Sequence, residues 1–165
     1  MPAAPIPKDE PERLRTLRAL NVLDSRSEPF SHSVSAAAAS IANTPIGAVT
    51  LVDADRLTFK GACGVGDDPM PRADAFCAHT ILASDPLLVT DMEADARFAD
   101  NPLVTGGPHL RFYAGFPLIV DGQPVGALCV LDDHARELSG EQIEALEELA
   151  AGTSIWLVQR GEEER

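Results

Sequence analysis

Cysteine is scarce in this sequence, and the few cysteines present form no recognisable motif. There are three, Cys63, Cys77 and Cys129, with no C-x-x-C pair among them. This spacing excludes a zinc ribbon and a thioredoxin-like redox site. Because the N-terminal residues also lack an apolar stretch of signal-peptide length, the odd number of cysteines predicts reduced thiols in the cytoplasm and no disulfide framework.

Long hydrophobic runs and an excess of positive charge are also missing. The longest apolar runs, residues 116–120 and 125–131, fall far short of the roughly 20 residues that a membrane-spanning helix needs. The chain has 13 basic side chains against 26 acidic ones, a net charge of −13, so a phosphate backbone would repel it. We therefore expect neither a membrane nor a nucleic acid as a partner.

The sequence does contain enough apolar residues for one domain of ordinary size. Of its 165 residues, 45% are hydrophobic and 24% are charged, which is the composition of a soluble globular protein. A chain of this length buries roughly two-thirds of its unfolded surface without help from metals or disulfides. We predict a single domain over residues 1–165, with an ordered core at about residues 9–159.

Two segments have the pattern of β-hairpins. In the first, residues 46–52 and 57–63 flank a turn, and residues 46–52 are apolar or small on both faces, as in a strand that is covered on both sides. In the second, residues 113–120 and 125–131 flank Asp121-Gly122, which is the strongest short hairpin signal.

Helical spacing marks three further segments. Residues 9–20 begin with Asp9 as the expected N-cap, residues 30–41 are followed by Pro45, and a long helix follows the capping box that Ser139 and Gln142 would form. Hairpins combined with such helices predict an α+β fold. We expect an antiparallel sheet of five or six strands, with the terminal helices on one face and residues 64–110 on the other.

Residues 64–110 form a very long connection between the two hairpins. Most connections in compact domains have about 4–6 residues, and this one holds most of the side chains able to do chemistry. We expect a short helix at residues 76–83, a strand at 87–90 and a helical turn at 97–101. We interpret the region as the part of the protein that recognises its target.

Several motifs, in this order, resemble those of a bacterial GAF domain of the subtype often found with histidine kinases and diguanylate cyclases. The resemblance covers about residues 11–159. The motifs are Val49-Thr-Leu-Val-Asp53, Phe76-Cys-Ala-His-Thr-Ile81, Asp95-Ala-Arg-Phe-Ala-Asp-Asn-Pro102, Arg111-Phe-Tyr-Ala-Gly115 and Gly126-Ala-Leu-Cys-Val-Leu-Asp132.

This resemblance implies a GAF-like (PAS/profilin-like) fold and a small-molecule sensor or protein-interaction module, often dimeric through its terminal helices. It identifies neither a ligand nor a cofactor, because members of this family bind many different molecules. No kinase, cyclase or DNA-binding domain follows Trp156. We therefore expect the signal to pass to a separate protein, such as a histidine kinase or a cyclase.

Ten residues are candidates for binding the small molecule. A binding pocket needs a few convergent polar groups in an apolar lining, and arginine suits a carboxylate or phosphate. The alternative is that Arg97 pairs with Asp91, Asp95 or Asp100 and only stabilises the loop. The ten candidates are Phe76, Cys77, His79, Asp91, Arg97, Phe98, Asn101, Arg111, Tyr113 and Phe116.

Cys77 and His79 allow two interpretations. On a helix, residues two apart point in nearly opposite directions and cannot share a metal or form a nucleophile–base pair; on an extended segment they would share a face, and a thiolate–imidazolium pair becomes possible. We favour a structural role, with Cys77 packed as a small hydrophobe and His79 bonded to a loop carbonyl. Covalent attachment of a tetrapyrrole is disfavoured because the flanking residues do not resemble the chromophore-binding pattern.

A thiol enzyme remains the alternative to a sensor. Free methionine-R-sulfoxide reductases are single-domain GAF proteins with a nucleophilic and a resolving cysteine, and this chain resembles them in size and in having Cys63 near its second strand. It departs from them because no cysteine lies between Asp91 and His109, where that family has an essential one. Cys129 is expected to be buried within a strand. We therefore predict no catalytic residue and no metal ligand.

The terminal helices carry an apolar stripe of their own. Leu14 and Leu17, together with Leu149 and Trp156, suit a parallel dimer bundle, although the same side chains would also serve to cover the sheet. We expect a homodimer that forms through the terminal helices.

Overall fold

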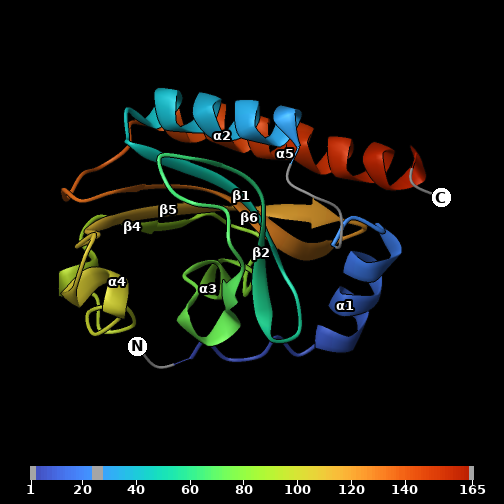
Figure 1. Ribbon diagram of the computed structural model, residues 1–165, viewed down its shortest axis with the longest axis horizontal. Helices are drawn as coiled ribbons and strands as arrows, with labels where there is room; N and C mark the ends of the chain where they lie inside the picture. Colours follow the sequence, from blue (N-terminus) through green and yellow to red (C-terminus); the bar gives the residue numbers. More distant parts are fainter. Residues whose placement is uncertain (1–2, 24–27, 164–165) are drawn as a thin grey trace.

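The computed structural model describes residues 3–23 and 28–163, which contain one six-stranded antiparallel sheet (Figure 1). The strands follow the spatial order β3-β2-β1-β6-β5-β4, which confirms the predicted α+β class and the antiparallel sheet. The strands are β1 (Ile46–Val52), β2 (Arg56–Cys63), β3 (Met70–Pro71), β4 (Leu87–Val89), β5 (Phe112–Val120) and β6 (Gln123–Asp132).

Both predicted hairpins are present. Asp121 and Gly122 join β5 to β6 with φ angles of 50° and 77°, the left-handed values that a type I′ turn requires. Strand β1 pairs with β2 on one side and with β6 on the other, and all of its residues are buried. Helices and loops therefore cover both faces of the sheet centre, as the apolar pattern of β1 predicted.

Two long helices, α2 (Pro29–Ala42) and α5 (Gly140–Glu163), run along one face of the sheet (Figure 1). The predicted capping box of α5 is formed: Ser139 Oγ accepts the Gln142 backbone N–H at 3.1 Å, and Gln142 Oε1 accepts the Ser139 backbone N–H at 2.8 Å. Helix α2 ends at Asn43, which has a left-handed φ of 57°, before Pro45 is reached. Asparagine is one of the few residues that tolerate this conformation at a helix end.

Helix α1 (Glu10–Ala19) lies at the end of the sheet, near the β5–β6 turn (Figure 1). Its Leu17 reaches the core beneath α2 and α5, but of the two terminal helices only α5 lies along the sheet face. Asp9 occupies the N-cap position as predicted, but its side chain makes no capping hydrogen bond. The fully buried Arg13 anchors the helix instead, by bonding to Glu10 and to the Pro124 carbonyl oxygen.

The 64–110 region folds over the opposite face and has a buried core of its own there. Each helix in this region has only three or four residues. The helices are η1 (Arg72–Asp74), α3 (Cys77–Thr80), η2 (Met92–Ala94) and α4 (Pro102–Thr105).

The sequence predicted the positions of these elements more accurately than their lengths. The helix predicted at residues 76–83 is only the four-residue α3, and the predicted strand is the three-residue β4. The helical turn at 97–101 is present, with the Asn101 N–H donating to the Phe98 carbonyl oxygen at 3.0 Å. Helix α4 was not predicted, although Asn101 caps it by accepting the Leu103 N–H at 2.8 Å and Pro102 begins it.

Candidate functional site

A cavity of about 130 Å³ lies between the sheet and the 64–110 region. Strands β1, β2, β5 and β6 contribute one side of it, and the 64–110 region contributes the other. No charged side chain of the described residues lines it. The lining residues are Ile46, Ala48, Thr50, Leu57, Phe59, Val65, Met70, Phe76, Cys77, Leu103, Pro108, Leu110, Tyr113, Cys129 and Leu131.

A group of buried side chains lies beside the cavity, and we call it the thiol cluster: Cys77, Thr80, Tyr113 and Cys129, of which all but Thr80 line the cavity. Tyr113 Oη lies 2.7 Å from Thr80 Oγ1 and donates a hydrogen bond to Cys77 Sγ at 3.3 Å. Cys77 Sγ lies 3.9 Å from Cys129 Sγ. Short α3 brings Cys77 and Thr80, while the central strands β5 and β6 bring the other two.

The contacts within the thiol cluster make the two sulfurs chemically different. The hydrogen bond with Cys129, helped by Thr50 and Tyr113, lowers the pKa of Cys77 to about 7 against the opposing effect of burial. The same contact with Cys77, together with burial, raises the pKa of Cys129 well above its ordinary value. Burial and the neighbouring Cys77 charge raise the pKa of Tyr113. These directions, together with the hydrogen bond that Tyr113 donates to Cys77, favour ionisation of Cys77 over that of Cys129.

Three of the ten predicted ligand-binding residues, Phe76, Cys77 and Tyr113, line this cavity. Phe98 lies behind them and is fully buried; its ring meets that of Phe76 edge-on, with the ring centroids 5.7 Å apart. The aromatic side chains at the cavity are therefore Phe76 and Tyr113, and Phe98 packs against Phe76 from behind.

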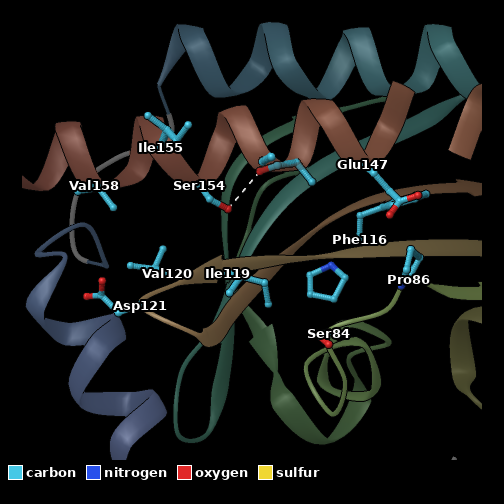
Figure 2. Close-up of a pocket in the computed structure, with 13 residues that line it drawn as sticks. Ser84, Pro86, Phe116, Ile119, Val120, Asp121, Glu147, Ser154, Ile155 and Val158 are labelled. Carbon is cyan, nitrogen blue, oxygen red and sulfur yellow. Dashed lines mark hydrogen bonds between the residues drawn. The ribbon is translucent and has the colours of Figure 1, made fainter. Parts of the chain in front are cut away.

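Phe116 does not line this cavity, because its side chain lies on the opposite face of the sheet, and a binding role for it remains a prediction. The Phe116 side chain belongs to the core beneath α2 and α5 and borders an open groove next to α5 (Figure 2). The reason is the alternation of side chains along a strand: Tyr113 and Phe116 are three residues apart on β5 and must point to opposite faces.

The predicted charged residues pair with one another outside the cavity. Arg111 binds Asp91 through two hydrogen bonds of 2.7 and 2.6 Å, and Arg97 binds Asp95 through two of 3.0 and 2.7 Å. The hydrogen bond from Arg111 lowers the pKa of Asp91. Of the alternatives considered for Arg97, pairing with Asp95 is confirmed.

Asn101 is fully buried and has a structural role in addition to capping α4. Its side-chain amide donates to the Asp74 carbonyl oxygen at 3.1 Å, which links η1 to α4. Neither Asn101 nor the charged residues Asp91, Arg97 and Arg111 line the 130 Å³ cavity. A binding role for these four residues remains a prediction.

Cys77 and His79 do not form a pair. Cys77 faces the thiol cluster, whereas the His79 ring meets that of Phe98 edge-on, with centroids 4.8 Å apart. Burial, and secondarily the charge of Arg97, lower the pKa of His79, and its Nε2 atom finds no hydrogen-bond partner within the described chain. His79 and Arg97 border a separate hollow of about 520 Å³ next to the N-terminal segment.

A third hollow, of about 470 Å³, is the open groove between α5 and β5 (Figure 2). Ile155 and Val158 of α5 border it and are 61% and 37% exposed. The apolar stripe predicted for the dimer is not the one that is exposed. Leu17 is fully buried, and the Trp156 ring stacks on Phe30 of the same chain with centroids 4.9 Å apart.

One group of possible metal ligands occurs among the described residues, formed by Asp132, Asp133 and His134, with one ligand atom of each within 4.8 Å of the others. Arg136 already pairs with Asp132 at 2.6 Å, and exposed His134 lies 2.7 Å from Asp133. The hydrogen bond with Asp132, followed by the charge of Asp133, raises the pKa of His134. These contacts satisfy the group without a metal ion.

The sequence interpretation missed the role of Cys129, which was treated only as a buried strand residue. The turn at Asp121-Gly122 did not contain the necessary signal, because the pairing of β5 with β6 shifts by one residue between Leu118 and Ile119. Continued from the turn without that shift, the pairing would place Cys129 opposite Ala114. The shift determines the observed register. In that register Cys129 lies opposite Gly115 and Tyr113 opposite Leu131. Residues two apart share a face, so Cys129 and Tyr113 had to face the 64–110 region together.

Comparison with known proteins agrees with this architecture. The family model of the GAF domain matches residues 26–155. A cyclic di-GMP phosphodiesterase of Pseudomonas aeruginosa is 37% identical over 152 residues, which are 91% of this chain and 26% of that protein. The chain thus spans about a quarter of the length of this relative.

Two solved structures have the same fold at low sequence identity. The GAF domain of the Acinetobacter phosphoenolpyruvate-protein phosphotransferase superposes with a TM-score of 0.68 at 14% identity, over 92% of this chain and 94% of that one. Free methionine-R-sulfoxide reductase from Neisseria meningitidis, in complex with its substrate, gives 0.65 at 16% identity, over 93% and 92%. At such identities the likeness concerns the fold alone.

Proposed function

This chain belongs to the GAF domain family, and we propose that it senses a small molecule in bacterial signal transduction and regulates an output partner. The observation that carries the proposal is the cavity between the sheet and the 64–110 region. The relative from Pseudomonas aeruginosa, a much longer cyclic di-GMP phosphodiesterase, supports a regulatory role for a domain of this kind. We propose a signalling enzyme, such as a histidine kinase or a cyclase, as the partner.

The size and lining of the cavity define the class of ligand. An apolar cavity of about 150 Å³ can hold benzene, so the volume of about 130 Å³ here suits an uncharged molecule of similar size or smaller. Phe76 and the aliphatic residues would bury the ligand. The hydroxyl groups of Thr50 and Tyr113 are already bonded within the protein, to the Ala127 carbonyl oxygen and to Thr80 and Cys77, so the cavity suits an apolar molecule. A charged ligand would lose its hydration without gaining a counter-charge.

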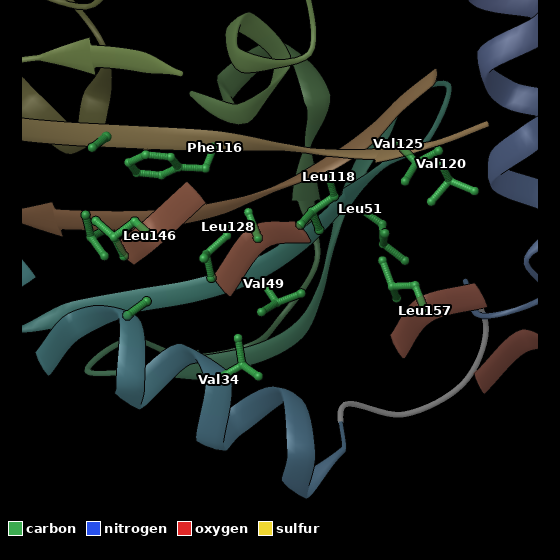
Figure 3. Packing of buried hydrophobic residues seen from close by; sticks show 14 of the residues in the cluster. Val34, Val49, Leu51, Phe116, Leu118, Val120, Val125, Leu128, Leu146 and Leu157 are labelled. Carbon is green, nitrogen blue, oxygen red and sulfur yellow. The ribbon is translucent and has the colours of Figure 1, made fainter. Parts of the chain in front are cut away.

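Strand β6 provides a physical route from the cavity to the helices. Cys129 and Leu131 line the cavity. The alternate residues of the strand, Leu128 and Val130, belong to the core beneath α2 and α5, where Figure 3 shows Leu128. Close-packed cores transmit small displacements instead of absorbing them. A ligand that shifts β6 would therefore move the surface that α5 presents to a partner.

An enzyme of the methionine sulfoxide reductase type is the weaker candidate. Cys77 does line the cavity, which that chemistry would require. A free amino acid carries both a carboxylate and an ammonium group, however, and burying these charges without partners is costly. No charged group of the described residues lines the cavity to receive them. We therefore propose a non-enzymatic role.

We propose that the domain is cytoplasmic and forms a homodimer through α5. The three cysteines are free, as expected in a reducing compartment, and no helix among the described residues is long and apolar enough to cross a membrane. Ile155 and Val158 are the exposed apolar residues of α5. Glutamates 141, 144, 147 and 148 of the same helix would repel a second copy, so the contact would involve the C-terminal half of α5.

Native mass spectrometry of the protein purified from its own host tests the sensing proposal. We expect a bound small molecule, and we expect it to be lost in Val65→Trp, because Val65 lines the cavity and an indole there would fill it. Leu88→Trp is the matched control, since both residues are 47% exposed and Leu88 does not line the cavity. Retention of the molecule in Val65→Trp would contradict the proposed site.

A further inference from the structure

The only two cysteines that lie together among the described residues are both buried and both line the cavity. Cys77 and Cys129 are 4% and 3% exposed, and their sulfur atoms are 3.9 Å apart. Cys63, by contrast, is half-buried at the end of β2 and does not line the cavity. A structural thiol needs no hydroxyl donor aimed at it, yet Tyr113 donates a hydrogen bond to Cys77 Sγ at 3.3 Å.

We propose that Cys77 and Cys129 are a peroxide-reactive dithiol, in which Cys77 is the nucleophile and Cys129 the resolving thiol, and that oxidation joins them in an intramolecular disulfide. This chemistry goes beyond the sensing role proposed above and does not depend on it. The substrate class is a small hydroperoxide, and hydrogen peroxide itself is small enough to enter a cavity of about 130 Å³, since a water molecule occupies about 30 Å³ in the liquid.

The surroundings of the two sulfurs assign their roles. Tyr113 Oη donates to Cys77 Sγ, Cys129 Sγ lies 3.9 Å from Cys77 Sγ, and Thr80 Oγ1, 2.7 Å from Tyr113 Oη, holds the phenol in place. Donors around a sulfur stabilise its thiolate, which is the reactive form. Cys129 has no comparable set of donors, and its place beside a Cys77 thiolate keeps it protonated until the second step.

In the first step the Cys77 thiolate attacks one oxygen of the peroxide. The new S–O bond forms as the O–O bond breaks, and the leaving oxygen takes the electron pair as hydroxide, which becomes water with the proton that Cys77 released on ionising. Cys77 is then a sulfenic acid. In the second step the Cys129 sulfur attacks Cys77 Sγ, the S–O bond breaks, and the oxygen leaves with the Cys129 proton as a second water. Two thiols and one peroxide give one disulfide and two waters: the sulfurs lose two electrons, and the peroxide oxygens gain them.

The fold allows the sulfurs to meet, and it determines which element moves. A disulfide requires an S–S distance of about 2.05 Å, so the 3.9 Å gap must close. Cys129 lies on β6, which is paired on both sides by β1 and β5, whereas Cys77 begins the four-residue helix α3 in the 64–110 region. The movement therefore falls on α3, which would approach the sheet and narrow the cavity.

Peptide mapping after treatment with hydrogen peroxide tests the proposal directly, because trypsin places the three cysteines in three different peptides. Cleavage after Lys60, Arg72, Arg97, Arg111 and Arg136 gives residues 61–72 with Cys63, 73–97 with Cys77 and 112–136 with Cys129. We expect the 73–97 and 112–136 peptides to become linked, with the loss of two hydrogen atoms from the intact mass, and the link to be reversed by dithiothreitol. Cys63→Ser should behave as the wild type.

Single variants separate the two steps. Cys129→Ala should stop at the Cys77 sulfenic acid, which a dimedone-type reagent traps, and Cys77→Ala should give neither the sulfenic acid nor the link. Far-ultraviolet circular dichroism shows whether each variant is folded, and the wild-type map needs no variant at all. A folded wild-type protein in which Cys63 is oxidised while the 73–97 and 112–136 peptides stay unlinked would overturn the proposal. So would links between separate chains through Cys77.

Discussion

Glu10 of α1 accepts a hydrogen bond of 2.7 Å from Arg72, which lies 62 positions further along the chain at the start of the 64–110 region. The same carboxylate bonds to Arg13, whose side chain is fully buried. Two buried guanidinium groups thus share one counter-ion. Their contact links α1 to the segment that covers the cavity. A displacement of that segment would therefore also displace the N-terminal helix.

We expect Glu10→Gln to destabilise the protein by about 2–4 kcal/mol. The substitution keeps the size of the side chain but leaves the two arginines without their shared negative charge, and an uncompensated buried charge is among the most costly defects in a protein. Urea unfolding measures the loss. Glu12→Gln, on the exposed side of the same helix, is the control and should change stability by less than about 0.5 kcal/mol. Equal effects of the two variants would contradict the role of Glu10.

The Glu10 carboxylate also predicts that the stability of the protein falls at acidic pH. Burial acts to raise the pKa of Glu10, but the hydrogen bonds from Arg13 and Arg72 outweigh it and lower the pKa from its ordinary 4.5 to about 2. Because the folded pKa lies below the unfolded one, the contribution of Glu10 to stability is complete above pH 4.5 and declines as the pH falls toward 2. Wild type should therefore lose more stability than Glu10→Gln over this interval, as unfolding at several pH values would measure.

Much of the fold was predictable because short-range signals agree with one another. Asp121-Gly122 determines a hairpin by its backbone requirement alone, and the Ser139 and Gln142 side chains satisfy each other's backbone at the start of α5. The first turn of α1 shows where such signals fail. Asp9 occupies the N-cap position as predicted but makes no capping hydrogen bond, and Glu10 binds Arg72, a partner that no local pattern reveals.

The position of the site was predictable from the sequence, but the contacts among its side chains were less so. The length of the 64–110 connection pointed to a cavity beneath it, and Phe76, Cys77 and Tyr113 are indeed at that cavity. The charged candidates Asp91 and Arg111 pair with each other at the surface and do not line the cavity. Residue type alone could not show this pairing. The contact of Cys77 with Cys129, 52 positions apart, depends on strand register and on the docking of α3, which only the folded chain determines.

Close packing of α2 on β1 gives a third prediction. A Cβ atom at Gly47 would collide with the Ser35 carbonyl oxygen of α2, whereas one at Gly66 would meet open space. Gly47→Ala must therefore push the helix away from the sheet, and we expect a loss of about 3 kcal/mol. Gly66→Ala should be within about 0.5 kcal/mol of the wild type. Thermal unfolding of the two variants compares them directly, and a stable Gly47→Ala protein would contradict this packing.

The proposed dimer is tested by sedimentation. We expect Ile155→Glu to sediment as a monomer at concentrations where the wild type is a dimer, because the new charge would lie on the exposed apolar half of α5 and be desolvated at the contact. Leu88→Glu introduces the same charge at an exposed leucine on β4 and should remain dimeric. Trp156 is a poorer position to test, since its ring stacks on Phe30 within the chain. A dimeric Ile155→Glu would exclude this helix face.

The enzyme alternative is tested by assaying methionine-R-sulfoxide with a thiol reductant. We expect no turnover above that of Cys77→Ser, because the cavity offers no charged side chain of the described residues to the substrate's carboxylate and ammonium groups. Cys63→Ser is a second control, since that thiol does not line the cavity. Turnover that disappears with Cys77 would replace the sensing proposal with a catalytic one.

The dithiol finally predicts a pH profile that a structural pair of cysteines would not have. Because the Cys77 thiolate attacks peroxide, the rate of disulfide formation should rise with pH and level off above the pKa of Cys77, which its hydrogen bonds with Cys129, Thr50 and Tyr113 lower to about 7. Tyr113→Phe removes one donor to the thiolate, a bond worth about 1.5–3 kcal/mol, and should move the profile up by about one pH unit or more. At neutral pH the variant should then react roughly tenfold more slowly, while Cys63→Ser keeps the wild-type profile. Quenched-flow mixing with peroxide, stopped by acid and followed by peptide mapping, measures these rates. If Tyr113→Phe left the pH profile unchanged, the Tyr113 hydroxyl would not stabilise the Cys77 thiolate.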